Sequence, residues 1–421
     1  MTARNRLDAT GDAGRVSPVQ RAPASRSAYG RLWQQPGAPA LLTSSVLGRL
    51  PSSMNALGLL LLLRDRDGIR TAALVVALFT LAFAAASPVL GRLADRHGPR
   101  SVLLATGVAH PLALVAVVLL ADARSTAVVV VAAVVAGATA PPVSACARAL
   151  WPRVTTTPET LATAYAADAV ATEVVWIAGP LLLGLVVAVA SPALAVLVAA
   201  ALALVGTLAV AGHPAARALH GQPARTAPRG HVLAVPALRA LIAAEVCLTV
   251  GLGIIIVAIP TYASEDATAG VLVAVWGIGS AVFGLIAGGL SWQVGFGRLA
   301  WVYLAAALVI APLALLPGAP VVVVALLLVL AGAPIAPVNL STYRLTAAAV
   351  PAGLSTSAFA WLTTVATVGM SAGSAVAGLL LPAEDQVGPG DLRLLYGVAA
   401  ALTGLGAVSL ARHARRTGTV R

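Results

Sequence analysis

Long apolar segments recur along the whole chain, and most exceed the roughly 18 residues that a helix needs to cross a bilayer. Only helices and closed barrels satisfy their backbone hydrogen bonds inside lipid. These segments are rich in Ala, Leu, Val and Gly and lack the alternation of a barrel strand, so helices are favoured. Charged residues make up 10% of the chain, against about 25% in a soluble domain. The sequence therefore predicts an all-α integral membrane protein.

Twelve spanning helices are expected from these segments, and most have lengths that suit a hydrocarbon core of about 30 Å. Their predicted ranges are 38–63, 71–91, 101–121, 125–148, 160–188, 191–212, 237–260, 268–290, 299–317, 319–344, 354–381 and 392–412.

Charge sets the orientation of these helices. Most arginines fall in loops and tails on the side of both termini, and most acids outside the helices fall on the opposite side. The positive-inside rule then places both termini in the cytoplasm of a multi-pass plasma-membrane protein. The same rule explains the net charge of +12, so no nucleic-acid partner is expected. Cys146 and Cys247 both lie in apolar segments, so neither a disulfide nor a zinc site is expected.

A polar, arginine-containing gap at 213–236 divides the predicted helices into two sets of six. Residues 38–212 and 237–413 form the two halves, flanked by a disordered cytoplasmic tail at 1–37 and a cytoplasmic tail at 414–421. The halves resemble one another, since Gly98 aligns with Gly295 and Arg148 with Arg344. Duplicated halves related by an axis along the membrane normal are a known transporter architecture, so we expect two pseudo-symmetric halves.

Residues 91–100, between the second and third helices, read GRLADRHGPR. Gly91 permits close packing and Gly98 a tight turn. Asp95 is an acid in a loop rich in arginine. It can pair with Arg148 or Arg153, or face the N-terminal end of a neighbouring helix, where an anion is favoured.

This segment resembles the signature loop of the major facilitator superfamily, and with twelve helices and a basic linker the resemblance covers about residues 38–413. It implies secondary transport by alternating access. It also implies that Asp95 contacts the eleventh helix, which begins near Gly353 and Ser355, and that this contact latches the halves. The alternative is a solvated loop that only sets topology. The predicted gating residues are Gly91, Asp95, Arg96, Gly98, Arg100, Arg148 and Arg344.

Gly179-Pro180 in the fifth helix resembles the end of a glycine-rich motif of the superfamily's antiporters, which favours export. The alternative is an ordinary proline kink. The fourth helix carries no arginine near its middle, where proton antiporters of the superfamily often have one. Arg148 lies too near the cytoplasmic end to replace it, so the usual coupling route is in doubt.

Ionisable groups inside a bilayer are costly and mark candidate functional sites. Arg49, Glu173 and Glu245 fall at similar depths in the first, fifth and seventh helices. Glu245 and Glu173 are candidate proton-carrying acids, with Arg49 as their switchable partner. The alternative for Arg49 and Glu173 is a permanent ion pair that fixes packing. Asp168 is expected to pair with Arg148 or Arg344.

The superfamily resemblance implies that the first, fourth, seventh and tenth helices line the cavity, which adds Asn55 and Asn339 as candidate substrate-binding residues. Asn55 is the weaker candidate, because it lies about 120° around the helix from Arg49. We expect a monomeric secondary transporter that exports an apolar or amphipathic small molecule, with protons as coupling ions. The alternatives are a proton-coupled importer of a polar or carboxylated metabolite and a non-transporting scaffold or receptor. No ATPase or metalloprotease motif is found, so no enzyme activity, cofactor or metal is expected.

Overall fold

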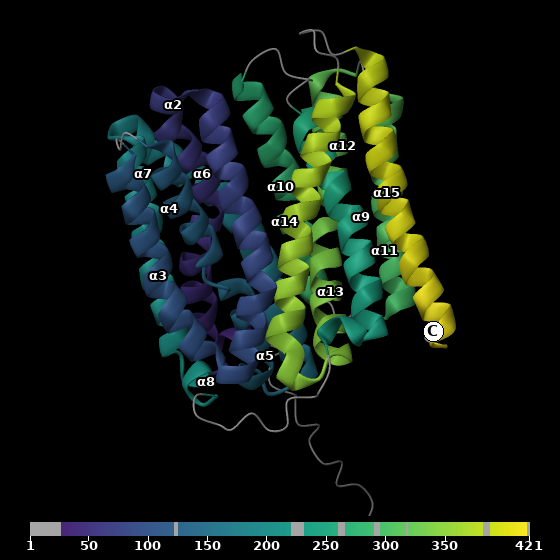
Figure 1. The fold of residues 1–421 in the computed structure, drawn as a ribbon. Helices are drawn as coiled ribbons and strands as arrows, with labels where there is room; N and C mark the ends of the chain where they lie inside the picture. Colours follow the sequence, from purple (N-terminus) through teal and green to yellow (C-terminus); the bar gives the residue numbers. More distant parts are fainter. Residues whose placement is uncertain are drawn as a thin grey trace, which may run out of the picture.

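The computed structural model describes residues 27–121, 125–219, 231–259, 266–289, 295–316, 319–381 and 388–418. Within these ranges the chain is helical, and twelve helices or helix pairs have the length and hydropathy of membrane spans. The two sets of helices stand side by side, and the C-terminus lies at the same end as α5, α8 and the lower part of α13 (Figure 1). The predicted all-α membrane fold is confirmed.

The first six spans form the N-terminal half. They comprise α2 (Ala38–His97), α3 (Pro99–Leu120), α4 (Thr126–Ala138), α5 (Val143–Val154), α6 (Pro158–Val189) and α7 (Pro192–Gly212). α2 contains two spans, Ala38–Arg64 and Thr71–His97, which meet at Gly68. Gly68 has a φ of 75°, a conformation that costs glycine little and that turns the chain back between the spans.

The last six spans form the C-terminal half. They comprise α9 (Pro236–Ala258), α10 (Asp266–Gly289), α11 (Phe296–Leu315), α12 (Val321–Gly332) with α13 (Ile335–Ala349), α14 (Ser355–Leu380) and α15 (Pro389–Arg416). The predicted linker at 213–236 contains the short helices α8 (Pro214–Arg217) and η1 (Val232–Ala234), and its residues 220–230 lie outside the described ranges. A further short helix, η3 (Ala352–Leu354), precedes α14.

The fourth and tenth spans are interrupted, whereas the sequence predicted continuous helices at 125–148 and 319–344. α4 ends before Pro141 and Pro142, and α12 ends before Pro334. A proline has no N–H to donate and its ring clashes with the preceding turn, so a helix breaks there. The helices that follow the two breaks are α5 and α13, and both carry residues of the site described below.

Three predicted boundaries differ from the structure, because helices extend into segments that were predicted as loop or tail. Residues 91–97 belong to α2 rather than to a loop, and Gly98 directly follows the helix with a φ of 84°, which suits the turn predicted there. The predicted disordered tail at 1–37 contains α1 (Ala28–Trp33), which is ordered because Leu32 is fully buried. Its first 26 residues lie outside the described part of the chain. The predicted C-terminal tail at 414–421 begins inside α15.

One hydrophobic cluster contains residues of both halves, and it lies at the end that bears the termini. It includes Leu150 and Tyr165 of the N-terminal half and Tyr343 and Phe359 of the C-terminal half. The other clusters each belong to a single half. The two halves therefore share a core at the end with the termini, and that end is closed.

Candidate functional site between the halves

The second span of α2 meets α14 across the boundary between the halves, and Asp95 makes the central contact. Its Oδ1 accepts a hydrogen bond from the Thr356 backbone N–H at 2.9 Å, and its Oδ2 accepts one from the Ser357 N–H at 2.8 Å. The Ser357 hydroxyl donates a third at 2.6 Å. These amide groups belong to the first turn of α14, which has no helical partners for them and favours an anion. Of the partners considered for Asp95, the structure shows the N-terminal end of the eleventh span.

Close backbone approach continues along the same contact. A Cβ at Gly91 would lie 2.7 Å from the Ala360 Cβ and 3.1 Å from the Thr356 carbonyl oxygen, so only glycine fits without displacement. Further along, the Ser87 hydroxyl donates to the Ala360 carbonyl at 3.4 Å and the Thr364 hydroxyl donates to the Ala84 carbonyl at 3.2 Å. We define the α2–α14 contact by these residues together with Asp95.

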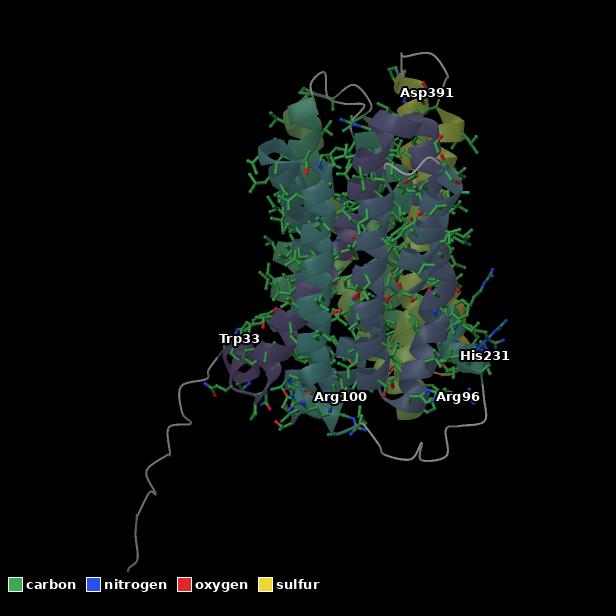
Figure 2. All side chains as sticks on the ribbon, turned by 60° about the vertical axis from the view of Figure 1, so that its left-hand side comes forward. Trp33, Arg96, Arg100, His231 and Asp391 are labelled. Carbon is green, nitrogen blue, oxygen red and sulfur yellow. The ribbon has the colours of Figure 1, made fainter. Side chains whose placement is uncertain are left out.

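The other predicted gating residues do not join this contact. Arg96 is exposed and Arg100 half-buried, and both lie at the end opposite Asp391 (Figure 2). Arg344 is half-buried on α13. Arg148 is buried in the charge cluster described next, where it pairs with Asp168 of α6.

α6 and α10 form the second contact between the halves, and α1 closes its end. The Tyr29 hydroxyl donates a hydrogen bond to the Leu285 carbonyl of α10 at 3.0 Å. Burial raises the pKa of Tyr29 above its usual value of 10.0, so the hydroxyl keeps the proton that it donates. Gly277 and Gly284 of α10 face Ile177 and Val170 of α6, and glycine permits this close approach.

A buried charge cluster lies between these two contacts. Arg49 Nη1 is 2.7 Å from Asp168 Oδ1, and Arg148 Nε is 2.8 Å from Asp168 Oδ2. Arg49 also donates to the Thr172 hydroxyl. Arg49 and Arg148 are 4% and 5% exposed and Asp168 is fully buried. The prediction that Asp168 pairs with Arg148 is confirmed, and one carboxylate neutralises only one of the two arginines.

Two residues of the C-terminal half, Tyr343 and Glu245, lie close to this cluster. The Arg148 guanidinium lies 3.9 Å from the centroid of the Tyr343 ring, an arrangement in which the ring face attracts the cation. Glu245 of α9 is 6% exposed, lies within electrostatic reach of Arg148, and its Oε2 has no hydrogen-bond partner. The cluster defined by Arg49, Arg148, Asp168 and Glu245 thus contains two arginines and two acids from both halves.

Two further candidate residues, Glu173 and Asn55, make their contacts away from Arg49. Glu173 lies near Ser280 of α10, although the Ser280 hydroxyl makes no hydrogen bond. Asn55 faces the interior of the N-terminal half, where its Nδ2 lies 3.3 Å from His110 Nε2. His110 Nδ1 lies 2.7 Å from the Ala136 carbonyl oxygen and therefore donates to it, so Nε2 accepts from Asn55. Asn55 thus contacts α3 of its own half rather than the charge cluster.

The remaining candidates lie outside the cluster. Asn339 is half-buried on α13. Gly179 packs its backbone against Ser53 of the first span, and the Ser53 hydroxyl donates to the Val175 carbonyl at 2.9 Å. Gly179-Pro180 therefore brings α2 and α6 together near Arg49. Across the described ranges no three His, Cys, Asp or Glu residues gather as a metal site would require.

Sequence analysis did not single out Thr172 or Tyr343. A signal existed for Thr172, which follows Asp168 by one helical turn and so shares its face. Tyr343 precedes Arg344 directly, and nothing in the sequence distinguishes it from a core aromatic residue.

With this geometry in view, comparison with known proteins identifies the family. The sequence pattern that describes the Major Facilitator Superfamily matches residues 41–374. The chain belongs to this superfamily. It is therefore a multi-pass membrane protein of a transporter family whose members are generally not enzymes. A search of curated proteins finds no match.

Solved structures of the superfamily share the fold. A bacterial homologue of the iron transporter ferroportin, in an outward-facing state, has a TM-score of 0.72 at 13% identity and covers 89% of this chain and 98% of its own. The human organic anion transporter MFSD10 (TETRAN) has a TM-score of 0.65 at 17% identity, with 88% and 99% covered. The proton:xylose symporter XylE has a TM-score of 0.68 at 14% identity, with 88% and 94% covered. At these identities the likeness shows the fold alone.

Proposed function

We propose that this superfamily member is a proton-coupled secondary transporter in which Glu245 carries the proton and Arg148 is its switchable partner. The observation that carries this proposal is the unpartnered Glu245 Oε2, buried beside an arginine that is anchored in the other half. A buried ionisable group without a fixed partner is costly, and such groups in membranes mark ion pathways.

Alternating access makes the pairing switchable. Arg148 and Asp168 both belong to the N-terminal half, so their ion pair moves as a unit. Glu245 belongs to the C-terminal half and moves relative to that pair when the halves rock. An opposite charge within about 4–6 Å favours the ionised carboxylate. Separation from Arg148 thus changes how strongly Glu245 holds a proton, which links proton binding to the conformational step.

The α2–α14 contact provides the closing interaction. Asp95 binds the first turn of α14 only while the end with the termini is closed, so these hydrogen bonds stabilise that state selectively. We place this end in the cytoplasm of a plasma-membrane protein, in agreement with the distribution of arginines.

Export of an amphipathic, cationic compound is the substrate class that the charge cluster favours. With Glu245 ionised, two acids balance two arginines, and a proton or a monovalent organic cation adds the same single charge. Proton and substrate then compete for one state of the cluster, which is the requirement for antiport. The resemblance of Gly179-Pro180 to the end of the antiporters' glycine-rich motif supports the same direction.

A second candidate rests on the two arginines themselves. When Glu245 is protonated, Asp168 alone faces Arg49 and Arg148, and one positive charge remains to bind a carboxylated solute. A proton and a carboxylate would then be carried together, as in an importer.

Transport by purified protein in proteoliposomes tests the proposal. Glu245→Gln should lose accumulation driven by a pH gradient and keep substrate exchange without a gradient, because glutamine preserves the shape and removes the proton site. Glu159→Gln, an exposed acid in the first turn of α6, is the matched control and should keep both activities. Gradient-driven accumulation by Glu245→Gln would refute the assignment.

The two substrate classes separate in a thermal-shift screen. Cationic amphipathic compounds should stabilise the wild-type protein more at high pH, where Glu245 is ionised. Carboxylated solutes should stabilise it more at low pH, where Glu245 is protonated. Stabilisation by carboxylated solutes alone would favour the importer.

A further inference from the structure

A groove runs between α9 and α15, and all the residues that line it belong to the C-terminal half. Its volume is about 620 Å³. The two helices pack against each other along their length. The groove is at the end with the termini, since it includes the start of α9 and the last turn of α15. Its lining includes Arg239, Ala243, Cys247, Val408, Arg412 and Arg416.

Each wall changes from basic to apolar along the helix. On α9, Arg239 is followed on the same face by Ala243 and Cys247, at intervals of one turn. These three residues extend over about 12 Å, at about 1.5 Å of rise per residue. On α15, Val408 precedes Arg412 and Arg416 in the same manner, running the other way. The arginines of both helices therefore meet at one end, above a shared apolar floor.

The three arginines are available to a ligand. Arg239, Arg412 and Arg416 are exposed, and none forms an ion pair with any residue that the structure describes. The floor is accessible too, since Val408 is 43% exposed. A soluble anion would leave the apolar residues of the groove without a contact. A lipid without net charge would leave the three arginines without an anionic partner.

We propose that this groove binds one anionic phospholipid. The arginines hold the headgroup phosphate through guanidinium N–H groups, which match phosphate oxygens in pairs. An acyl chain lies over Ala243, Cys247 and Val408. Basic pockets between helices at the membrane surface are suited to anionic headgroups, and the groove lies at that depth, at the end of two spans. This inference does not depend on which substrate or ion the protein carries.

Native mass spectrometry of the delipidated full-length protein tests the proposal. The probes are dioleoyl phosphatidylglycerol and dioleoyl phosphatidylcholine, which have the same acyl chains and differ in net charge. The first phosphatidylglycerol should bind about a hundredfold more tightly than phosphatidylcholine, since each arginine near a headgroup contributes about fivefold. Equal affinity for the two lipids would overturn the proposal.

Variants locate the site. R239Q/R412Q/R416Q should lower phosphatidylglycerol affinity to that of phosphatidylcholine, and each single variant should lower it about fivefold, which keeps the test valid if the triple variant folds poorly. Arg415→Gln removes an exposed arginine from the same last turn without touching the groove, so it should keep the preference. An equal loss in Arg415→Gln would indicate diffuse surface charge, and the proposal would fail. Glycerol 3-phosphate should not displace the lipid, and displacement by it at equal concentration would assign the groove to a soluble phosphate instead.

Discussion

Asp168 Oδ2 lies 2.8 Å from Arg148 Nε, and both side chains are buried inside the membrane domain. Because Arg49 pairs with the other oxygen of the same carboxylate, Asp168 compensates two cations at once. If this acid is lost, both guanidinium groups lose their carboxylate partner in the protein interior, where an unpaired charge is costly.

Asp168→Asn should therefore destabilise the protein by about 3–5 kcal/mol, the cost of breaking a buried ion pair by removing one partner. Unfolding in detergent, followed by heat or by denaturant, measures the loss. The double variant Arg49→Gln/Asp168→Asn should recover part of it, because Arg148 then faces Glu245 alone. A stable Asp168→Asn protein, or no recovery in the double variant, would show that the cluster is more hydrated than the buried arrangement implies.

Residues near the charge cluster show which parts of the site the sequence determines. Depth along a helix is readable from the sequence, so Arg49, Asp168, Glu173 and Glu245 could be placed in neighbouring layers. The direction in which each side chain points around the helix axis cannot be read from the sequence in the same way. Asp168 and Glu173 are five residues apart, about 140° around an ideal helix, so only one of them can face Arg49. Tertiary packing of α2 on α6 selects Asp168.

The pairing of Arg148 with Asp168 followed from the sequence, because both residues were expected near the same end of their helices. The break at Pro141 and Pro142, which separates α5 from α4, was not predicted. In contrast, the contact of Asp95 with α14 followed from local features, namely one acid between Gly91 and Gly98. A six-residue helix such as α1 was not predictable, because its order depends on packing against α6 and α10.

Asp95→Asn should reduce transport about tenfold or more while the protein still inserts and folds. The asparagine retains one acceptor oxygen for the first turn of α14 but loses the charge, and hydrogen bonds to charged groups contribute about 1.5–3 kcal/mol. Transport per folded molecule in proteoliposomes measures the effect. Asp391→Asn is the control, since Asp391 accepts a hydrogen bond from the Gly388 N–H at 2.8 Å and so caps its own helix. Normal transport by Asp95→Asn would indicate that residues 91–100 serve only to set the membrane topology.

Gly91→Ala should open the end with the termini. The added Cβ collides with Ala360 and with the Thr356 carbonyl, and overpacking of this kind costs about 1–3 kcal/mol in the closed state alone. A cysteine at Ser87, which is 4% exposed in the α2–α14 contact, should then react faster with a water-soluble thiol reagent in a background lacking Cys146 and Cys247.

The control for this measurement is Gly184→Ala, whose Cβ would meet nothing within 4 Å. It should leave the reactivity of the Ser87 cysteine unchanged. If Gly91→Ala also leaves it unchanged, the two helices tolerate a methyl group between them and the closed state does not depend on their close approach.

Asn55→Ala should lower stability without altering substrate affinity. The substitution leaves His110 Nε2 without its donor inside the N-terminal half, and an unsatisfied buried acceptor costs about 1–3 kcal/mol. Thermal unfolding and ligand binding, measured on the same preparation, separate the two effects. A large loss of affinity in a stable Asn55→Ala protein would return this residue to the substrate site.

The distribution of arginines predicts the orientation of the protein in the membrane. His231 and Asp391 lie at opposite ends of the molecule (Figure 2), and the arginine-rich end is the one with His231. Because the positive-inside rule retains arginine-rich segments in the cytoplasm, His231→Cys should react with a membrane-impermeant maleimide only after cells are permeabilised. Gly390→Cys, exposed beside Asp391, should react in intact cells. The reverse pattern would place both termini outside and would also reverse the side on which Asp95 closes the transporter.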